Sequence, residues 1–368
     1  MKLLRNIEKD GINLKNLRVL LRLDLNVPIQ DNKIVDDFRI RKSLASINFL
    51  REKGAIIIII SHIESKYNTT LKPIAEYFNT LGIDCIFEKN YKKALDFSDE
   101  NSTDKIIMLE NLRMHEGEEE NDKKFAKELA SLADIYVNDA FPVSHREHAS
   151  ICAITEFIPS YAGFQFEEEI KHLSSAFKPS DTERPFVFIL GGAKFDTKLP
   201  LVEKFISIAD MVFIGGALAH DFYKAQGIDI GRSLTSDTPP DLSKIINNKK
   251  IILPIDNVKV DNVIMDIGLQ TVDLLQKEIN KAKYILWNGP MGAYETGYNA
   301  GTLKLAEILS DATKKGIKTI VGGGDTLATI TELKLEDSFT FISTGGGAML
   351  DYLAKGTLPG IEALERGL

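Results

Sequence analysis

The chain has few of the residues and segments that mark several large protein classes. It contains only two cysteines, Cys85 and Cys152, too few for a disulfide framework and typical of a reducing compartment. Its longest apolar run, residues 55–60, is far shorter than the roughly 20 residues that span a bilayer. The first residues also lack the apolar region of a signal peptide. We therefore expect a cytoplasmic protein with no membrane partner.

Positive charge is also in deficit. The 45 Lys and Arg residues against 53 Asp and Glu give a formal net charge of −8. This balance disfavours general affinity for nucleic acid, although a local basic site can lie inside an acidic protein. Because 368 residues exceed one typical core, we expect a globular protein of two domains.

Several catalytic signatures are missing. The chain has no G-x-x-x-x-G-K-[ST] phosphate loop and no G-x-G-x-x-G after a predicted strand, which excludes a Walker-type ATPase and a typical dinucleotide dehydrogenase. It also lacks a G-x-S-x-G elbow and a reactive-cysteine signature. His145, His148 and Cys152 have a spacing that zinc ligands can show. Since no second ligand pair accompanies them, anion-binding or structural roles are favoured.

Apolar runs alternate with helical patterns along the chain. The continuous run 55–60 is typical of a strand covered on both faces. Apolar residues at positions 40, 44, 47 and 50 have the spacing of a helix. This alternation predicts an α/β fold with parallel sheets wrapped by helices. The predicted strands lie at 18–28, 55–60, 85–87, 105–109, 134–137, 186–190, 210–214, 250–253, 283–287, 317–321 and 339–343.

The stretch 166–183 divides the chain. Residues 167–177 have the pattern of one helix, and a polar loop with two prolines follows at 178–185. We place the interdomain helix and linker at 166–183, the first domain at 1–165 and the second domain at 184–354.

Glycine clusters follow the predicted strands of the second half. In open parallel sheets, ligands bind beyond the carboxyl ends of the strands. Glycines let backbone N–H groups approach an anion, and a helix N-terminus adds positive potential. The pattern therefore predicts a nucleotide along this sheet edge. The clusters are 191–192, 215–216, 288–292, 322–326 and 345–347.

Charged residues beside these clusters fit a phosphate site. Lys194 and Lys198 are four residues apart, so they share one helix face and can reach the same phosphates. Two solvated lysines would look the same in isolation, and the surrounding glycines favour the phosphate site. Asp325, directly after three glycines, is predicted to hold Mg²⁺ that bridges phosphate oxygens. It can also cap a helix, and the two roles can coexist.

The strand ends of the first half carry arginine, histidine and hydrogen-bonding groups instead of glycine. Clustered arginine suits a small phosphorylated or carboxylated ligand, because its planar fork binds such anions bidentately. One arginine alone is more often part of a surface salt bridge, but the set predicts a site. Its members are Arg22, Asp24, Asn26, Arg39, His62, Arg113, His145, Arg146 and His148.

Nine short motifs, in this order and over essentially the whole chain, resemble those of the phosphoglycerate kinase family. Those in the first half are 22–28 (RLDLNVP), 36–41 (DDFRIR), 109–115 (LENLRMH), 136–141 (YVNDAF) and 145–150 (HREHAS). Those in the second half are 190–194 (LGGAK), 287–292 (WNGPMG), 322–326 (GGGDT) and 343–348 (STGGGA). Each motif is moderately specific, and the ordered series is very specific.

The resemblance implies two Rossmann-like domains, each a parallel sheet wrapped by helices, joined by a hinge helix, with the tail 355–368 returning to the N-terminal domain. It implies a monomeric kinase that moves a phosphoryl group between ATP and the carboxylate of 3-phosphoglycerate, with Mg²⁺. The glycerate would be held by Asp24, Asn26, Arg39, His62, Arg113 and Arg146. The Mg-nucleotide would be held by Lys194, Glu295, Gly323, Gly324, Asp325 and Thr326. The catalytic groups would be Arg39, Lys194, Lys198, Gly345 and Gly346.

Three positions depart from the family pattern. Residues 61–66 read SHIESK where the family usually has SHLGRP, so Glu64 and Ser65 replace a glycine and an arginine. Losing one charged hydrogen bond of about 1.5–3 kcal/mol weakens binding roughly ten- to 150-fold. Ala217 stands at the third position of a usual glycine triplet, where it can crowd the nucleotide. These changes keep open the alternative of a nucleotide-binding relative with weakened or lost catalysis.

Overall fold

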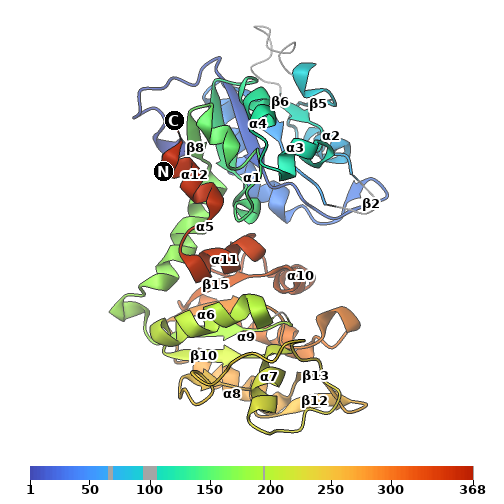
Figure 1. Ribbon diagram of the computed structural model, residues 1–368, viewed down its shortest axis with the longest axis vertical. Coiled ribbons are helices and arrows are strands. Elements are labelled where there is room, and N and C mark those ends of the chain that lie inside the picture. The colour runs from blue at the N-terminus through green and yellow to red at the C-terminus, as the bar shows by residue number, and fades with distance from the viewer. Residues whose placement is uncertain (65–68, 94–105, 194, 368) are drawn as a thin grey trace. The chain divides into compact units, whose positions relative to one another are not determined.

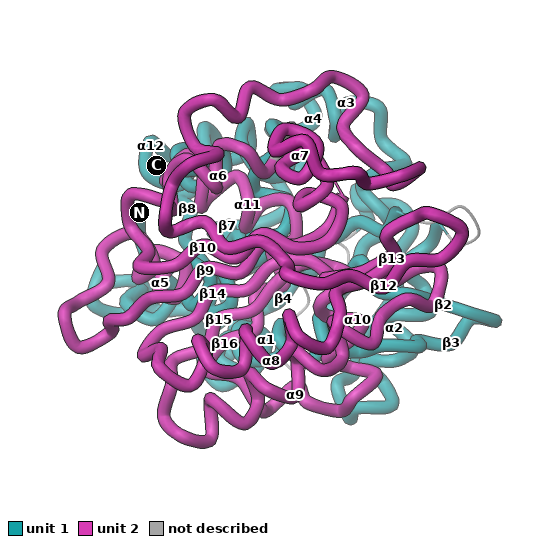
Figure 2. Tube along the Cα trace, turned by 90° about the horizontal axis from the view of Figure 1, so that it is seen from below, with its two compact units in different colours: residues 1–170, 357–368 teal, residues 171–356 magenta. Residues whose placement is uncertain are grey.

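The chain folds into two compact units. The computed structural model describes residues 1–64, 69–93, 106–193 and 195–367. Unit 1 comprises residues 1–170 and 357–368, and unit 2 comprises residues 171–356 (Figure 2). The chain therefore passes between the units twice.

Unit 1 is built on a six-stranded parallel sheet (Figure 1). Its central strands are β4 (Ile56–Ile60) and β1 (Arg18–Leu23), paired in parallel from Arg18 with Ile56 to Arg22 with Ile60. The predicted strand 18–28 was too long, since β1 ends at Leu23 and polar residues of the following loop carry site groups. The full strand order is β5 (Cys85–Glu88), β6 (Ile106–Leu109), β4, β1, β7 (Ile135–Asp139) and β8 (Ser160–Ala162).

Alternate residues of β4 enter two different cores. Ile57 and Ile59 pack in one buried cluster, and Ile58 and Ile60 pack in another. Because successive strand side chains point to opposite faces, this sheet is covered on both sides, as the continuous apolar run predicts. The covering and flanking helices are α1 (Phe38–Glu52), α2 (Lys72–Thr80), α3 (Glu116–Glu119), α4 (Lys123–Ala130) and α12 (Pro359–Arg366), and a small hairpin pairs β2 (Ile29–Gln30) with β3 (Lys33–Ile34).

The helix α5 (Phe164–Ser174) starts in unit 1 and ends in unit 2. It begins three residues before the predicted helix start at 167, and the predicted last turn is a separate 3-10 turn over Ser175–Phe177.

Unit 2 repeats the architecture with a second six-stranded parallel sheet. The strand order is β11 (Ile251–Ile252), β10 (Met211–Ile214), β9 (Phe186–Leu190), β14 (Tyr284–Asn288), β15 (Lys318–Gly322) and β16 (Phe341–Ser343). The helices are α6 (Phe195–Ile208), α7 (Leu218–Ala225), α8 (Leu269–Ile279), α9 (Ala300–Lys314), α10 (Gly324–Glu332) and α11 (Gly347–Lys355), and β12 (Asn257–Val260) pairs with β13 (Val263–Ile267) as a hairpin. The predicted fold of two Rossmann-like domains is confirmed.

Both sheets reverse their strand order at one point. In unit 1 the reversal lies between β1 and β7, and in unit 2 it lies between β9 and β14. Such reversals open a crevice beyond the carboxyl ends of the strands, where ligands of α/β proteins bind. The predicted arginine and glycine groups follow these strands.

Candidate active site

A buried ion network lies at the carboxyl ends of β1 and β4, where the strand order predicts a crevice in unit 1. Arg22 is fully buried, and its guanidinium donates to Ser150 Oγ at 3.0 Å and to His62 Nδ1 at 3.2 Å. Glu118 lies 4.0 Å from the same guanidinium and accepts from the Ser150 hydroxyl at 2.6 Å. Because arginine has donors only, His62 Nδ1 must accept, which leaves the proton on Nε2.

The loop after β1 and the start of α1 place a second arginine. Arg39, in the first turn of α1, forms a hydrogen-bonded ion pair with Asp24, which is nearly buried. Asn26 accepts a hydrogen bond from the Glu64 backbone N–H at 3.1 Å. Asn26, which the sequence predicts for substrate binding, thus ties the loop after β1 to the loop after β4.

Two further arginines meet at Glu64. Oε1 of Glu64 lies 3.1 Å from Arg113 NH2 and 2.5 Å from Arg146 NH1. Arg113 also pairs with Glu119. Among the described residues, Arg113 Nε and His148 Nδ1 are buried without a hydrogen-bond partner. Unsatisfied buried polar atoms are uncommon, so their presence here indicates that this crevice takes a polar ligand.

The arginines shift the pKa values of nearby groups. Burial, followed by the charges of Arg22 and Arg113, lowers the pKa of His62 well below its usual value. Burial and the arginine charges likewise lower the pKa of His148 to about 4. Burial alone would raise the pKa of Glu64, but the hydrogen bond and charge of Arg146 with the charge of Arg113 lower it. At neutral pH the crevice therefore holds neutral histidines and charged arginines.

Several supporting residues were missed by sequence reasoning. Glu118 lies within the acidic run 116–120, which has the pattern of a solvated surface, yet it is completely buried. Asn111 accepts from the Ile63 backbone N–H and donates to the carbonyl oxygen of Thr69. The only signal for Asn111 was its place two residues before Arg113, just beyond the end of β6.

Unit 2 brings its glycine clusters into direct contact. The Gly192 N–H donates to the carbonyl of Pro290 at 2.8 Å, and the Gly191 N–H donates to that of Asn288 at 2.8 Å. A Cβ added to Gly191 would lie 2.1 Å from the Pro290 carbonyl oxygen. Only glycine permits this approach, so the turns after β9 and β14 form one continuous backbone surface.

Lys198 lies inside this glycine surface. It is in α6 and nearly buried, and its Nζ donates to the Gly191 carbonyl at 2.5 Å. A Cβ added to Gly192 would lie 2.7 Å from that Nζ. Lys194 and Ser65 lie outside the described residues, so the role of Lys194 and the loss of affinity at position 65 stay predictions.

A cavity of about 380 Å³ opens beside these turns. Apolar side chains such as Leu234 and Met291 line it together with Gly192 and Gly216. Such a combination of apolar wall and backbone turns suits a flat aromatic ring carrying an anionic chain. Of the residues predicted for nucleotide binding, Glu295 and Asp325 line the cavity, and so does Ala217. Ala217 has helical backbone angles (φ −65°), so this position does not require glycine.

The remaining predicted residues sit at helix starts. Gly323 precedes α10 with φ +108°, and Gly324 is its first residue. Asp325 is exposed in the first turn, with Gly323 rather than Asp325 at the N-cap. Thr326 is buried, and its hydroxyl accepts from the Gly289 N–H at 3.0 Å.

The other predicted glycines precede α11. Gly346 occupies its N-cap with φ +51°, and the Gly345 N–H donates to Ser343 Oγ at 3.1 Å. The Gly345 amide is thus engaged within its own turn, while the start of α11 supplies the positive end of a helix.

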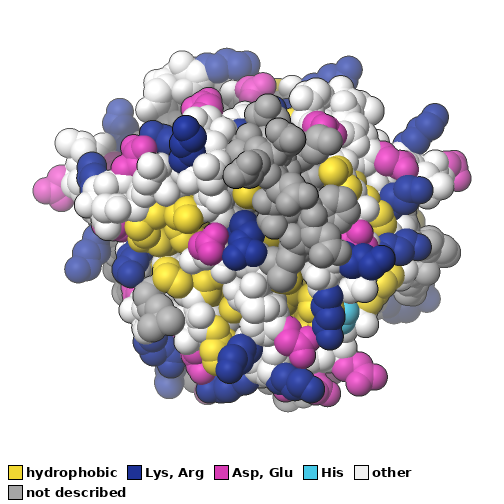
Figure 3. Space-filling view, turned by 90° about the horizontal axis from the view of Figure 1, so that it is seen from above, with side chains coloured by type: hydrophobic (Ala, Val, Ile, Leu, Met, Phe, Trp, Pro, Cys, Tyr) yellow, Lys and Arg dark blue, Asp and Glu magenta, His cyan; other side chains and the backbone are white. Residues whose placement is uncertain are grey.

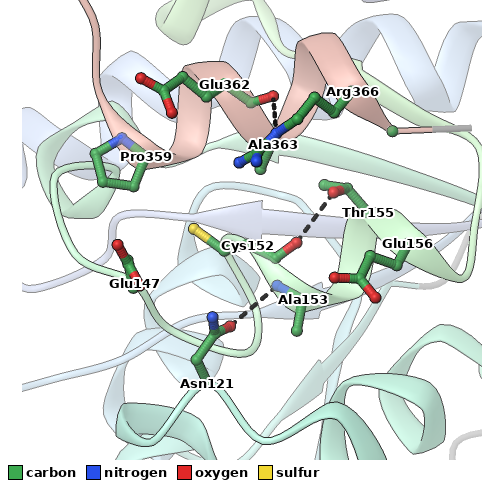
Figure 4. Close-up of a pocket in the computed structure, with 11 residues that line it drawn as sticks. Asn121, Glu147, Cys152, Ala153, Thr155, Glu156, Pro359, Glu362, Ala363 and Arg366 are labelled. Carbon is green, nitrogen blue, oxygen red and sulfur yellow. Dashed lines mark hydrogen bonds between the residues drawn. The ribbon is translucent and has the colours of Figure 1, made fainter.

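Other features do not form part of either crevice. A cavity of about 630 Å³ between α12 and the segment around Cys152 is lined by none of the predicted substrate or nucleotide residues (Figure 4). Burial raises the pKa of Cys152 to about 12, so its thiol is unreactive at neutral pH. Among the described residues no group of three His, Cys, Asp or Glu side chains could hold a metal. The zinc-like spacing around His145 therefore forms no such site.

Two further features concern the distribution of surface charge and the length of the apolar helices. On the face drawn in Figure 3, basic and acidic side chains are interspersed rather than gathered into patches of one sign. No helix within the described ranges is long and apolar enough to cross a lipid bilayer.

Comparison with known proteins agrees with this arrangement. The family model described as phosphoglycerate kinase matches residues 9–356. A curated phosphoglycerate kinase of Wolbachia sp. subsp. Drosophila simulans is 41% identical over 399 residues, covering 98% of each chain. That of Chloroherpeton thalassium is 39% identical, covering 97% of this chain and 98% of its own.

Solved structures agree as well. The phosphoglycerate kinase of Coxiella burnetii superposes with a TM-score of 0.82 at 32% identity, covering 97% of this chain and 98% of its own. That of Pyrococcus horikoshii OT3 gives a TM-score of 0.83 at 29% identity, covering 99% and 98%. The family model and the curated relatives span nearly the full length, and both crevices carry the matching motifs. The chain therefore belongs to the phosphoglycerate kinase family.

Proposed function

We propose that this chain catalyses reversible phosphoryl transfer between ATP and the carboxylate of 3-phosphoglycerate, so that 1,3-bisphosphoglycerate and ADP interconvert with 3-phosphoglycerate and ATP in glycolysis and gluconeogenesis. The observation that carries the proposal is the presence of two chemically different anion sites, one in each unit. Unit 1 offers clustered arginines for a small, highly charged acid. Unit 2 offers a glycine-lined cavity with an apolar wall for a nucleotide.

In unit 1, Arg39, Arg113 and Arg146 supply charge for the phosphate and carboxylate of the glycerate. Asp24 orients Arg39 through their ion pair. His62 presents Nε2–H as a neutral donor, because Arg22 occupies Nδ1. Asn26 holds the neighbouring loop through the Glu64 amide. Each of these predicted substrate residues is therefore either held in place by a contact within unit 1 or holds a neighbouring residue in place.

The reaction needs no general base. The attacking carboxylate of 3-phosphoglycerate is already ionised at neutral pH. Catalysis then consists of positioning and of compensating the charge on the transferring phosphoryl oxygens. Lys198 supplies one positive charge at the glycine turns, and we assign the same task to Lys194, with the starts of α10 and α11 adding N–H groups at Gly324 and Gly346.

Mg²⁺ is the metal that the site fits. It is usually bound by one or two carboxylates together with substrate phosphates, and the exposed carboxylates of Asp325 and Glu295 line the nucleotide cavity. We assign Asp325 as its protein ligand and Glu295 to the nucleotide. When bound, Mg²⁺ would neutralise part of the charge on the nucleotide phosphates.

Transfer between two sites on different units requires the units to close, which also excludes water as a competing acceptor. We propose that closure bends the chain where it passes between the units, in α5 near residue 170 and after α11 at Gly356, whose φ is +83°. We further propose a monomer that acts in the cytoplasm.

The test is steady-state ATP consumption with Mg²⁺ and titrated 3-phosphoglycerate. We expect saturable turnover that requires both substrates, a large loss of turnover in Arg39→Ala, and a lower KM for 3-phosphoglycerate in Ser65→Arg. The control is Arg41→Ala on the same helix, because Arg41 pairs with Asp37 near the surface. Unchanged turnover in Arg39→Ala would refute the assignment of that residue. No observation favours the alternative of a non-catalytic nucleotide-binding relative.

A further inference from the structure

Each of the four arginines in the unit 1 crevice is paired with a carboxylate of the same unit. Arg22 pairs with Glu118 and Arg39 with Asp24, while Arg113 and Arg146 share Glu64. A substrate anion can reach this cluster only by joining or replacing one of these carboxylates. Arg113 also pairs with Glu119. These four carboxylates differ in how firmly they are held.

Asp24 and Glu118 are fixed parts of the crevice. Both are buried, and Glu118 also accepts from the Ser150 N–H at 3.0 Å and from its hydroxyl. Within the part of the chain that the structure describes, Glu119 pairs with Arg113 alone, and its side chain is 64% exposed. Neither the buried carboxylates nor the exposed one is placed as a ligand held between two arginines would be.

Glu64 is different, because one of its oxygens joins two guanidinium groups. Oε1 lies 2.5 Å from Arg146 NH1 and 3.1 Å from Arg113 NH2. An oxygen shared by two arginines is the arrangement in which phosphate and carboxylate ligands are bound. The Glu64 carboxylate therefore marks an anion position within the crevice.

The surroundings of Glu64 allow it to leave that position. Its backbone N–H is held by Asn26 Oδ1, so the start of the loop after β4 stays in place. Its side chain is 44% exposed, which gives the carboxylate a path into solvent without the loss of a buried contact. Exposure also limits the strength of the two ion pairs.

We propose that Glu64 is a built-in competitor of the substrate anion: its carboxylate occupies the position between Arg113 and Arg146 until an anionic group of the substrate displaces it. The identity of that substrate rests on the proposed function above. Glu64 thus lowers substrate affinity and keeps the arginines paired when no substrate is bound. Its effect is separate from the missing arginine at position 65.

The test is calorimetric binding of 3-phosphoglycerate, and separately of inorganic sulfate, to the full-length wild type, Glu64→Gln and Glu64→Ala. Removing two partly exposed ion pairs should tighten the binding of both anions by about five- to thirty-fold. The KM for 3-phosphoglycerate should fall by a similar factor, whereas the KM for ATP should stay within about twofold. The matched control, Glu119→Gln, removes a carboxylate from Arg113 without vacating the shared position, and should change either affinity by no more than about twofold.

Binding that is unchanged or weaker in both Glu64 variants would overturn the proposal, since it would make Glu64 a support for the arginines. Failure of the proposed function has a different signature. If the wild type consumes no ATP with 3-phosphoglycerate while both variants gain affinity for sulfate, the substrate assignment is wrong and the competition stands.

Discussion

The ammonium of Lys198 donates a 2.5 Å hydrogen bond to the carbonyl oxygen of Gly191, at the turn that follows β9. A Cβ on either neighbouring glycine would crowd that ammonium, at 2.7 Å for Gly192 and 3.0 Å for Gly289. The glycines are therefore needed both for the approach of backbone to backbone and for the room that the lysine occupies. This contact fixes a positive charge at the place where the two central turns of unit 2 meet.

We expect Lys198→Ala to lower kcat by roughly 10²–10³-fold, because a charge preorganised against the developing transition-state charge contributes on that scale. The KM for the nucleotide should change much less. Steady-state kinetics would measure both. Lys204→Ala is the control, since Lys204 lies on the same helix and also bonds a backbone carbonyl, that of Ala354, outside the nucleotide cavity. A kcat loss of less than about threefold in Lys198→Ala would contradict the catalytic role.

We expect Thr326→Val to destabilise unit 2 by about 1–3 kcal/mol, because it leaves the buried Gly289 N–H without its acceptor. The single tryptophan, Trp287, is buried in β14 and donates to the Gly289 carbonyl, so its fluorescence reports unfolding at this turn. Thr329→Val is the matched control, because the Thr329 hydroxyl donates to the Asp325 carbonyl in the same helix. Equal stability losses in the two variants would refute a special role for the Thr326 contact.

Acidification should weaken unit 1 through His148. Burial and the charges of Arg113 and Arg146 lower its pKa to about 4, below the usual 6.5 of the unfolded chain. The unfolded state therefore binds the proton more readily, and the stability that neutral His148 contributes is lost as pH falls from about 6.5 toward 4. Urea unfolding followed by circular dichroism at pH 7.5 and 5 should show a smaller acid-induced loss for His148→Gln. An identical loss in both proteins would contradict this.

Asp139 should act in the opposite direction. Burial raises the pKa of Asp139 to about 6. The stability that the protonated carboxyl contributes is therefore greatest below the unfolded-state pKa near 3.8, and it is lost as pH rises through 6. Asp139→Asn keeps an acceptor for the Phe166 N–H at the start of α5. At pH 8 we expect the variant to be more stable, by at most about 3 kcal/mol, with no gain below pH 4.

The matched variant for Asp139 is Asp37→Asn. Burial alone would raise the pKa of Asp37, but hydrogen bonds from Tyr77 and Arg41 lower it overall. Its stabilising contribution is therefore present above pH 4, and Asp37→Asn should lose stability at pH 8, where Asp139→Asn gains it. A stability loss at pH 8 in both variants would show that the Asp139 carboxylate stabilises the fold in its ionised form.

Features that depend on a local sequence pattern could be predicted from the sequence. The run 55–60 predicted a doubly covered strand, and β4 is buried on both faces. The glycines after the strands of the second half predicted a nucleotide-binding edge, and several of them line or support one cavity. These predictions depend on local pattern and on the rule that parallel strands bring their carboxyl ends to one edge.

Pairings between distant segments could not be predicted. Glu64 stands where the family has glycine, but its contacts with Arg113 and Arg146 join positions 49 and 82 residues apart and leave no local pattern in the sequence. Glu118 lies in an acidic run and gives no signal of burial beside Arg22. Thr326 follows a glycine motif that suggests ligand contact, but the hydrogen bond that its hydroxyl accepts from the Gly289 N–H joins positions 37 residues apart. In each case the tertiary packing decides which partner a polar group finds.

In the proposed reaction the phosphoryl group passes from ATP to a carboxylate. The most direct measurement incubates the protein with Mg-ATP, 3-phosphoglycerate and hydroxylamine, which converts an acyl phosphate into a hydroxamate. Hydroxamate should form in proportion to the ADP released, only with 3-phosphoglycerate present, and far more slowly with Lys198→Ala. ADP release with inorganic phosphate and no hydroxamate would contradict the account, because the acceptor would then be water.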